Sequence, residues 1–231
     1  MTYSERPAAV PGVVLWQRDV GPEPRRTPIL PDGCLDLLWD GQRLFVAGPD
    51  ATARWHRSPA GASYVALRCS GGTGPALLGV PAHELRDQTV GLERLVSSRA
   101  ARVLAERIAA DPAAALEAWA VERFAARGVD PIGPRVLAMA STGTPVAAMA
   151  DRLGLGTRQL HRRCLPVFGY SPRRLARVLR LGRSLEVARA GAPLAQVAAD
   201  CGYADQAHLS REVRDLTGTT PTRLLQELVR G

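Results

Sequence analysis

The stretch VAAMADRLGLGTRQLHRRCLPVFGYSPRRL (residues 146–175) is repeated later in the chain as LAQVAADCGYADQAHLSREVRDLTGTTPTRL (residues 194–224). The two copies align at an offset of 48 residues as far as Gly154 and Gly202, and at an offset of 49 beyond them. A repeat that survives a one-residue shift at a turn indicates two copies of one supersecondary unit.

Each copy has the pattern of a helix-turn-helix unit. A short apolar helix carries a small residue, Ala150 or Ala198, where a second helix crosses closely, and a glycine four residues later permits a sharp turn. In DNA-binding units of this kind the second helix enters the major groove. The side chains predicted to contact bases are Arg158, His161, Arg162, Gln206, His208 and Arg211.

A long helix is predicted between the two units. Ser171 and Pro172 form an N-cap followed by proline at the first helical position, and Gly191 stands where a C-terminal glycine is typical. The intervening SPRRLARVLRLGRSLEVARA gives a rod of about 30 Å. Successive major grooves on one face of DNA lie about 34 Å apart, so one helix of this length can hold two DNA-contacting helices in neighbouring grooves. Gly182 within this predicted helix lowers the stability of the helix by about 1 kcal/mol relative to alanine.

At these residues the chain resembles the DNA-binding domain of the AraC/XylS family of bacterial transcription regulators, over roughly residues 134–230. The most specific part is CGYADQAHLSREVRDLTGTTPTRLL (residues 201–225), which is similar to the family's second-unit signature. The resemblance implies sequence-specific binding near promoters, with Arg162 and Arg211 at matching positions of the recognition helices. It also implies activation through contact with RNA polymerase, with repression left open.

The chain departs from the family pattern at five positions. Cys164 and Val213 stand where phenylalanine is usual, so both recognition helices are expected to pack on smaller anchors. Gly156 and Ala204 stand where a serine N-cap is common, which weakens the helix starts. Pro166 is expected to fray or shorten the first recognition helix.

The basic residues are concentrated in the repeat region. The net charge is +8, and residues 130–231 hold 15 arginines against 8 acidic residues, whereas residues 1–129 hold 15 against 14. The chain contains no lysine. An excess of this kind is expected of a surface that binds phosphate. The residues predicted to contact DNA phosphates are Gln159, Arg163, Arg173, Arg174, Arg177 and Thr220.

The composition favours a reduced, cytoplasmic protein of two modest domains. The chain has 231 residues, of which 46% are hydrophobic and 23% charged. No apolar run is long enough to span a membrane, and the N-terminus lacks a signal-peptide pattern. The four cysteines are far apart and form neither a disulfide framework nor a zinc pattern, so neither a metal nor another cofactor is expected.

The fold class predicted is α+β. Short strands separated by turns are expected at residues 13–17, 35–39, 43–48, 53–57 and 63–69. They predict a small antiparallel β-domain over residues 1–92, which serves effector sensing or assembly and is barrel- or cupin-like by the family resemblance. Residues 93–128 form a helical pair with a break before Asp111, as a linker or a dimerisation element. GVDPIGP (residues 128–134) is the expected linker to the double helix-turn-helix domain of residues 129–231.

The string PDGCLDLLWDG (residues 31–41) is the most distinctive in the first half of the chain, and it resembles a turn-strand motif in N-terminal domains of some uncharacterised regulators of this family. Its Cys34 is either a reactive thiol or a small buried residue, and its Asp36 either faces a ligand or caps a turn. The candidates for effector binding are Cys34, Asp36, Trp39, Trp55 and Tyr64. The alternative is a structural role, which is the commoner one for single aromatic residues in such domains. His56 and His83 are too few and too far apart for a cupin metal site.

The sequence therefore predicts a non-enzymatic transcription regulator that binds double-stranded DNA. Its further predicted partners are RNA polymerase, a small-molecule effector and a second copy of the chain. Two alternatives are a thiol-dependent, alkyl-accepting sensor-enzyme fused to a DNA-binding module, with Cys34 as the acceptor, and an architectural protein that binds DNA without sequence preference.

Overall fold

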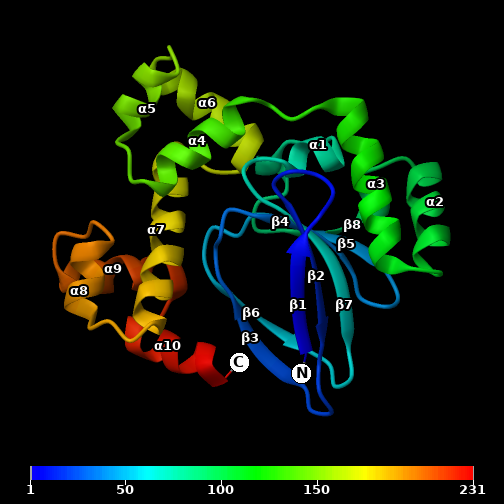
Figure 1. The fold of residues 1–231 in the computed structure, drawn as a ribbon, viewed down its shortest axis with the longest axis horizontal. Helices are drawn as coiled ribbons and strands as arrows, with labels where there is room; N and C mark the ends of the chain where they lie inside the picture. Colours follow the sequence, from blue (N-terminus) through cyan, green and yellow to red (C-terminus); the bar gives the residue numbers. More distant parts are fainter. Residues whose placement is uncertain (1, 231) are drawn as a thin grey trace.

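The structure, a computed structural model, describes residues 2–230 and consists of an antiparallel β region followed by helices (Figure 1). Two sheets lie within the described residues. The larger has the strand order β1-β2-β7-β4-β5-β8, and the smaller pairs β3 with β6. The strands are β1 (Thr2–Pro7), β2 (Val13–Asp19), β3 (Arg25–Ile29), β4 (Leu35–Trp39), β5 (Leu44–Ala47), β6 (Arg54–Ser58), β7 (Ser63–Cys69) and β8 (Thr89–Gly91). The predicted α+β class is confirmed.

Alternation along the strands separates the two faces of the larger sheet. Leu35 and Leu37 of β4 are buried on one face, whereas Asp36 between them lies on the other. Three strands were not predicted. The strand β1 is exposed throughout and so lacks alternation, β3 has the sequence RRTPI with two charges and a proline, and β8 is only three residues long.

Helices cover the apolar face of this sheet. They are α1 (Gly74–Leu78), α2 (Ser98–Ile108) and α3 (Pro112–Arg127), with short 3₁₀ turns η1 (Ala82–Glu84) and η2 (Leu92–Arg94). The predicted break before α3 is confirmed, because the Asp111 side chain caps that helix by accepting from the backbone N–H of Ala114 at 3.1 Å. Leu104 of α2 and Leu116 of α3 share the core of the sheet. The apolar faces of this pair are thus used within the chain.

The rest of the chain is helical: α4 (Ile132–Ser141), α5 (Val146–Arg152), α6 (Thr157–Phe168), α7 (Pro172–Arg189), α8 (Leu194–Asp200), α9 (Gln206–Thr217) and α10 (Pro221–Arg230). The predicted long helix is α7, capped by Ser171, whose hydroxyl accepts from the N–H of Arg174 at 3.2 Å. The predicted fraying at Pro166 is wrong. The helix α6 continues to Phe168, whose ring is buried, and ends at Gly169 in the left-handed region.

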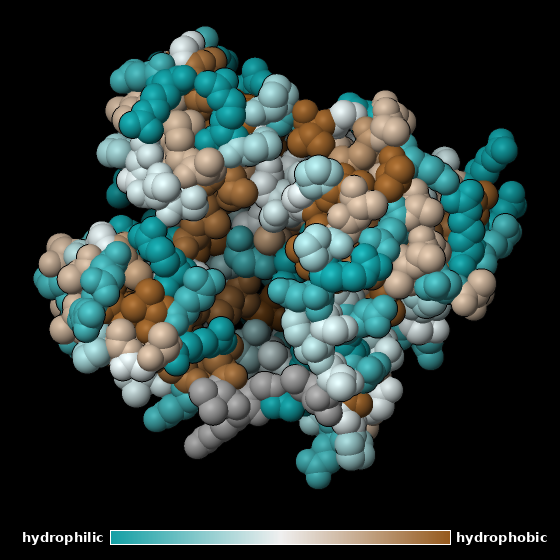
Figure 2. Space-filling model, in the orientation of Figure 1, coloured by the Kyte–Doolittle hydropathy of each residue, from teal (hydrophilic) through white to brown (hydrophobic). Residues whose placement is uncertain are grey.

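Two separate apolar cores lie along α7. The first contains residues of α4, α5 and α6 together with Leu175 of α7, and the second contains residues of α8, α9 and α10 together with Leu181 and Leu185. In Figure 1 the helix α7 joins the two groups of helices, and in Figure 2 they form separate lobes. The relative orientation of the two units therefore does not come from one shared core.

A loop of the β region, residues 49–53, contacts both units; we refer to it as the docking loop. The hydroxyl of Tyr170 donates to a carbonyl oxygen of this loop at 2.5 Å, and the guanidinium of Arg174 donates to the next one. The backbone N–H of Ala53 donates to the carbonyl oxygen of Leu216, near the end of α9, at 2.8 Å. The β region thus docks where α6 and α9 end.

The predicted linker is not a free tether. Its residues Ile132 and Gly133 belong to α4, and Gly133 lies so close to the β region that a Cβ there would be 2.4 Å from the carbonyl oxygen of Gly71. Only glycine permits this approach of helix to loop.

Replacing Gly133 should therefore destabilise the protein. We expect Gly133→Ala to lower the free energy of unfolding by about 1–3 kcal/mol, because the backbone must move to admit the methyl group. The matched control is Gly182→Ala in α7, where a Cβ meets nothing within 4 Å. This change should raise stability by about 0.5–1 kcal/mol. Urea unfolding of both variants measures these changes in the free energy of unfolding. Changes of the same sign in the two variants would contradict the close approach of Gly133 to Gly71.

Candidate nucleic-acid interface

The two predicted units are present with the expected geometry. Ala150 of α5 and Leu160 of α6 are buried where the two helices cross, and Gly154 in the turn between them has a φ of +66°. The helices α8 and α9 repeat this arrangement around Gly202, which has a φ of +74°. The positive φ explains why both turns carry glycine.

The smaller anchors of the two recognition helices are fully buried. Cys164 of α6 and Val213 of α9 are at most 1% exposed. The helix starts differ from each other. Gly156 is the N-cap of α6, as predicted, and its N–H donates to the side-chain oxygen of Gln159 at 2.8 Å. The prediction for Ala204 is wrong, because α9 is capped one residue later by Asp205.

The first recognition helix presents an exposed polar surface. Thr157, Arg158, His161 and Arg162 line a shallow hollow on α6 and are all exposed. No ion pair involving Arg158 or Arg162 occurs in the described part of the chain. Gln159, predicted to contact phosphate, accepts the backbone N–H of Gly156 at its side-chain oxygen.

The second recognition helix presents Gln206 and Arg211, which are also exposed. The N–H of His208 donates to the Asp205 carboxylate at 2.6 Å, and its ring nitrogen Nδ1 accepts from the N–H of Ala204 at 3.2 Å. The ring also forms a T-shaped contact with Tyr203, with the ring centroids 5.3 Å apart. The local structure of the helix start thus fixes the orientation of this imidazole.

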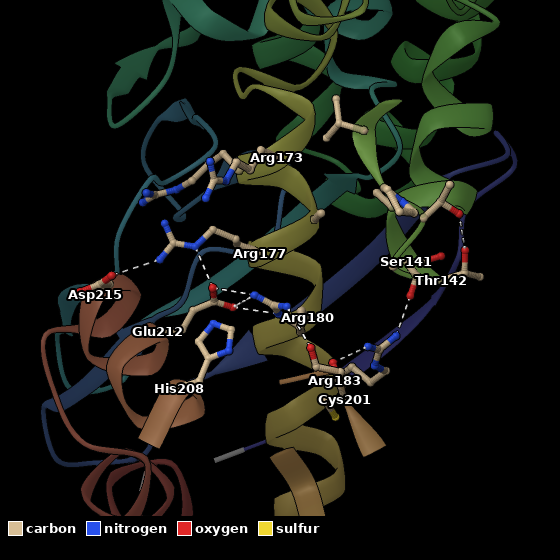
Figure 3. A pocket seen from close by; sticks show the side chains of 18 of the residues that line it. Ser141, Thr142, Arg173, Arg177, Arg180, Arg183, Cys201, His208, Glu212 and Asp215 are labelled. Atoms are coloured by element: carbon tan, nitrogen blue, oxygen red, sulfur yellow. Dashed lines mark hydrogen bonds and ion pairs between the residues drawn. The ribbon is translucent and has the colours of Figure 1, made fainter. Parts of the chain in front are cut away.

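Glu212 holds α9 against α7. It is only 6% exposed in its side chain, and it accepts from Arg177 Nε at 2.9 Å and from Arg180 Nη2 at 2.7 Å (Figure 3). The Arg180 guanidinium also stacks over the Tyr203 ring at 4.4 Å. Arg177 reaches the exposed Asp215 as well, at 3.3 Å. A buried carboxylate between two guanidinium groups is the pairing that such a burial requires.

Most of the predicted phosphate contacts have partners within the protein. Arg163 pairs with Asp130 at 3.2 Å, Arg174 binds the docking loop, and Arg177 binds Glu212. Thr220 caps α10 by accepting from the N–H of Arg223 at 3.4 Å. Arg173 is exposed and forms no ion pair among the described residues.

A groove of about 1250 Å³ separates the two units, with α7 along its length. It is bordered by the turn after α4 on one side and by α9 on the other, and its cationic lining includes Arg173, Arg180, Arg183, Arg211 and Arg214. The roles of Arg180 and Arg183 were missed from the sequence. Their signal was the recurrence of arginine at helical spacing along α7, at residues 173, 177, 180 and 183.

The candidate effector residues do not form one site. Asp36 accepts from the Trp16 indole N–H at 2.8 Å and lies 3.4 Å from Arg68 Nε. Trp39 packs against the core on the opposite face of the sheet, because its strand alternates. Trp55 is 42% exposed under the Arg26 guanidinium. Tyr64 lies on the Asp36 face of the sheet, in a small cluster that includes Trp16, and its ring lies near His56.

The pKa values in this region are set by burial. Burial raises the pKa of the Cys34 thiol well above its usual range, and the neighbouring Asp32 and Asp36 add to the shift. Burial also raises the pKa of Asp36 to about 6, against the opposing effect of Arg68. Cys34 is therefore a protonated thiol at neutral pH.

The described residues hold neither a candidate metal site nor a membrane-spanning helix. No group of three or more histidine, cysteine, aspartate or glutamate side chains there could hold a metal ion. None of the described helices is both long and apolar enough to cross a membrane.

Two parts of the chain match known protein families. Residues 149–227 match the family described as "Helix-turn-helix domain", and residues 13–91 match the family described as "Domain of unknown function (DUF6597)". No match is found among the curated proteins.

Several solved structures are similar to the chain. The C-terminal domain of AraT, a response regulator from Geobacillus stearothermophilus, is 19% identical over 42% of this chain and 85% of that one, with a TM-score of 0.39. A probable AraC family transcriptional regulator from Rhodopseudomonas palustris is 23% identical over 41% of this chain and 94% of that one, with a TM-score of 0.35. Wild-type ToxT from Vibrio cholerae, bound to an unsaturated fatty acid, is 12% identical over 98% of this chain and 99% of that one, with a TM-score of 0.49.

Paired helix-turn-helix units on one long helix, with an arginine-rich groove between them, define a DNA-binding protein. Residues 149–227 match a helix-turn-helix domain family, and the domain that precedes them matches a family whose function is unknown. The chain thus carries a DNA-binding domain.

The arrangement around Glu212 predicts a large difference between two acidic residues that bind the same arginine. Glu212→Ala should lower the free energy of unfolding by about 1–3 kcal/mol, because Arg177 and Arg180 lose a charge-assisted partner in a dry position. Asp215→Ala should change it by less than about 0.5 kcal/mol, because Asp215 is 69% exposed. Urea unfolding of both variants measures the difference, and equal effects would contradict this account.

The raised pKa of Asp36 predicts a dependence of stability on pH. The folded protein binds a proton at Asp36 more tightly than the unfolded chain, so this residue's contribution to stability falls as pH rises from about 4 to about 6. In Asp36→Asn this contribution is absent. The free energy of unfolding of the variant, measured in urea at both pH values, should therefore fall less, or rise more, than that of the wild type. Parallel pH profiles would show that Asp36 titrates normally.

Proposed function

We propose that the protein reads one face of a DNA duplex with α6 in one major groove and α9 in the next. The two helices are the second helices of their units, which is the element that enters the groove in helix-turn-helix proteins. The connecting helix α7 has 18 residues and is therefore about 27 Å long. This length is near the spacing of about 34 Å between successive major grooves.

The observation that carries this proposal is that some arginines are bound to partners within the protein, whereas others on the recognition helices are not. Arg163, Arg174 and Arg177 have partners within the protein, whereas Arg158, Arg162 and Arg211 project from the recognition helices without ion pairs among the described residues. Free guanidinium groups can pair with guanine or phosphate without breaking existing bonds. We therefore assign base contacts to Arg158, Arg162 and Arg211, with His161, Gln206 and His208 beside them.

The position of the β region is compatible with this binding mode. Its docking loop contacts the corner after α6 and the end of α9, whereas the free arginines lie nearer the beginnings and middles of these helices. Because the docking loop contacts both units, a conformational change in the β region can be transmitted to both of them. Effector sensing by this region, a second copy of the chain, contact with RNA polymerase and a cytoplasmic location remain predictions of the sequence.

The alternative function, alkyl transfer to Cys34, gains no support from the geometry. A thiol becomes a nucleophile as the thiolate, which a nearby positive charge or a helix N-terminus stabilises. Around Cys34, burial and two carboxylates raise the pKa, and they outweigh Arg68. We therefore do not adopt this alternative.

The proposed roles predict different effects for two arginines. Arg211→Ala should weaken binding to the preferred duplex by about 1–3 kcal/mol and relax the preference at one base position. Arg173→Ala should weaken binding to all sequences alike and lower the slope of affinity against salt by about one. Fluorescence anisotropy can measure both on duplexes that the protein selects from random DNA, and on random DNA itself. Identical behaviour of the two variants across sequences would contradict the assignment, and equal wild-type affinity for selected and random DNA would favour an architectural binder.

A further inference from the structure

The junction between the two apolar cores falls at a weak point of α7. Leu179 of α7 still packs against the first core, and Leu181 is the first residue of the helix in the second core. Directly after it comes Gly182, exposed, with nothing within 4 Å of where a Cβ would be. Glycine is the least restrained residue in a helix interior, and no side chain packs here to stiffen the rod. Bending at this point would change the angle between α6 and α9.

The next residue, Arg183, connects the two units. Its Nη1 donates to the carbonyl oxygen of Ser141 at 2.8 Å, and its Nη2 donates to the carbonyl oxygen of Cys201 at 3.0 Å. Ser141 is the last residue of α4 in the first unit, and Cys201 follows the last residue of α8 in the second. Figure 3 shows the side chain reaching both carbonyls from α7.

The chemistry of this contact suits a side chain that holds the two units at a fixed angle, which we call a brace. The carbonyls at a helix C-terminus lack partners within the helix and carry partial negative charge, so a guanidinium there forms charge-assisted bonds. The planar guanidinium offers several donors in a fixed geometry, and a lysine ammonium cannot replace two of them across the same span. The docking loop, which also touches both units, forms its hydrogen bonds with Tyr170, Arg174 and the end of α9 and not with these two helix ends.

We propose that Arg183 is a positioning residue that fixes the angle between the two helix-turn-helix units across Gly182. By fixing this angle it sets the separation of DNA half-sites that the protein accepts. The brace itself follows from the protein's own contacts, and only its effect on DNA rests on the proposed function.

The brace is tested by a distance measurement without DNA. Spin labels are placed on the two recognition helices through Arg158→Cys and Gln206→Cys, with the half-buried Cys34 replaced by serine, and the label–label distance distribution is recorded by electron paramagnetic resonance. We expect one narrow distribution, a broader one after Arg183→Ala, and an intermediate one after Arg183→Lys. Arg189→Ala, which removes an exposed arginine of the same helix, should leave it unchanged.

A second substitution separates hinge motion from general loss of structure. Adding Gly182→Ala to Arg183→Ala should narrow the distribution again, because alanine stiffens the helix at the junction. Circular dichroism confirms that each variant retains its helix content. The proposed brace is overturned if the distance distribution of Arg183→Ala is as narrow as that of the wild type, or if the distribution of the double variant is as broad as that of Arg183→Ala.

The consequence for DNA is tested on duplexes that the wild type selects from random sequence, with one base pair inserted or removed between the half-sites. The wild type should discriminate against both changes, and Arg183→Ala should lose about fivefold of that discrimination, as expected for the loss of a net hydrogen bond. Undiminished discrimination in Arg183→Ala overturns the effect on spacing. A wild type without any spacing preference, combined with broadened distances in the variant, supports the brace and overturns the two-groove function.

Discussion

The relation between the two helix-turn-helix units depends on a helix that runs through two cores without uniting them. Leu175 belongs to the first core and Leu185 to the second, so each unit is stabilised by its own apolar contacts. Cores of this kind fix the fold of each unit but leave their mutual angle to α7, to the docking loop and to polar contacts that cross the groove. The contacts across the groove come from arginines, which therefore help to determine how the duplicated unit works as a pair.

Arginine has two kinds of role here. The chain has 30 arginines and no lysine, so residue type alone does not show which of them meet DNA. Burial and pairing separate them: Arg177 and Arg180 converge on the buried carboxylate of Glu212, whereas Arg211 on the same helix α9 projects without an ion pair among the described residues. Moving a guanidinium from a buried carboxylate to DNA costs free energy, because the carboxylate would be left unpaired. The protein thus keeps part of its positive charge for its own architecture.

The repeat and the helix ends could be predicted because they depend on local chemistry. The turn glycines, the Ser171 and Asp111 caps and the length of α7 follow from backbone preferences that a few neighbouring residues express. The partners of Arg163 and Arg174 could not be predicted, since Asp130 and the docking loop reach them only through the tertiary fold. Pro166 misled for a related reason, because the buried Phe168 keeps the last turn of α6 helical. The candidate effector residues were scattered because alternation placed Trp39 and Asp36 on opposite faces of the sheet.

The place where the β region docks has a mechanical consequence. Recognition helices read bases with residues near their N-terminal ends, whereas the docking loop bonds to Leu216 near the C-terminal end of α9 and to Tyr170 just beyond α6. A helix of 12 residues such as α9 is a stiff lever about 18 Å long. A small shift of the docking loop would therefore tilt the reading ends while leaving them uncovered. In this arrangement the proposed control by the β region would act on the alignment of α6 and α9 and not on their access to DNA, and the proposed Arg183 brace would limit the tilt between them.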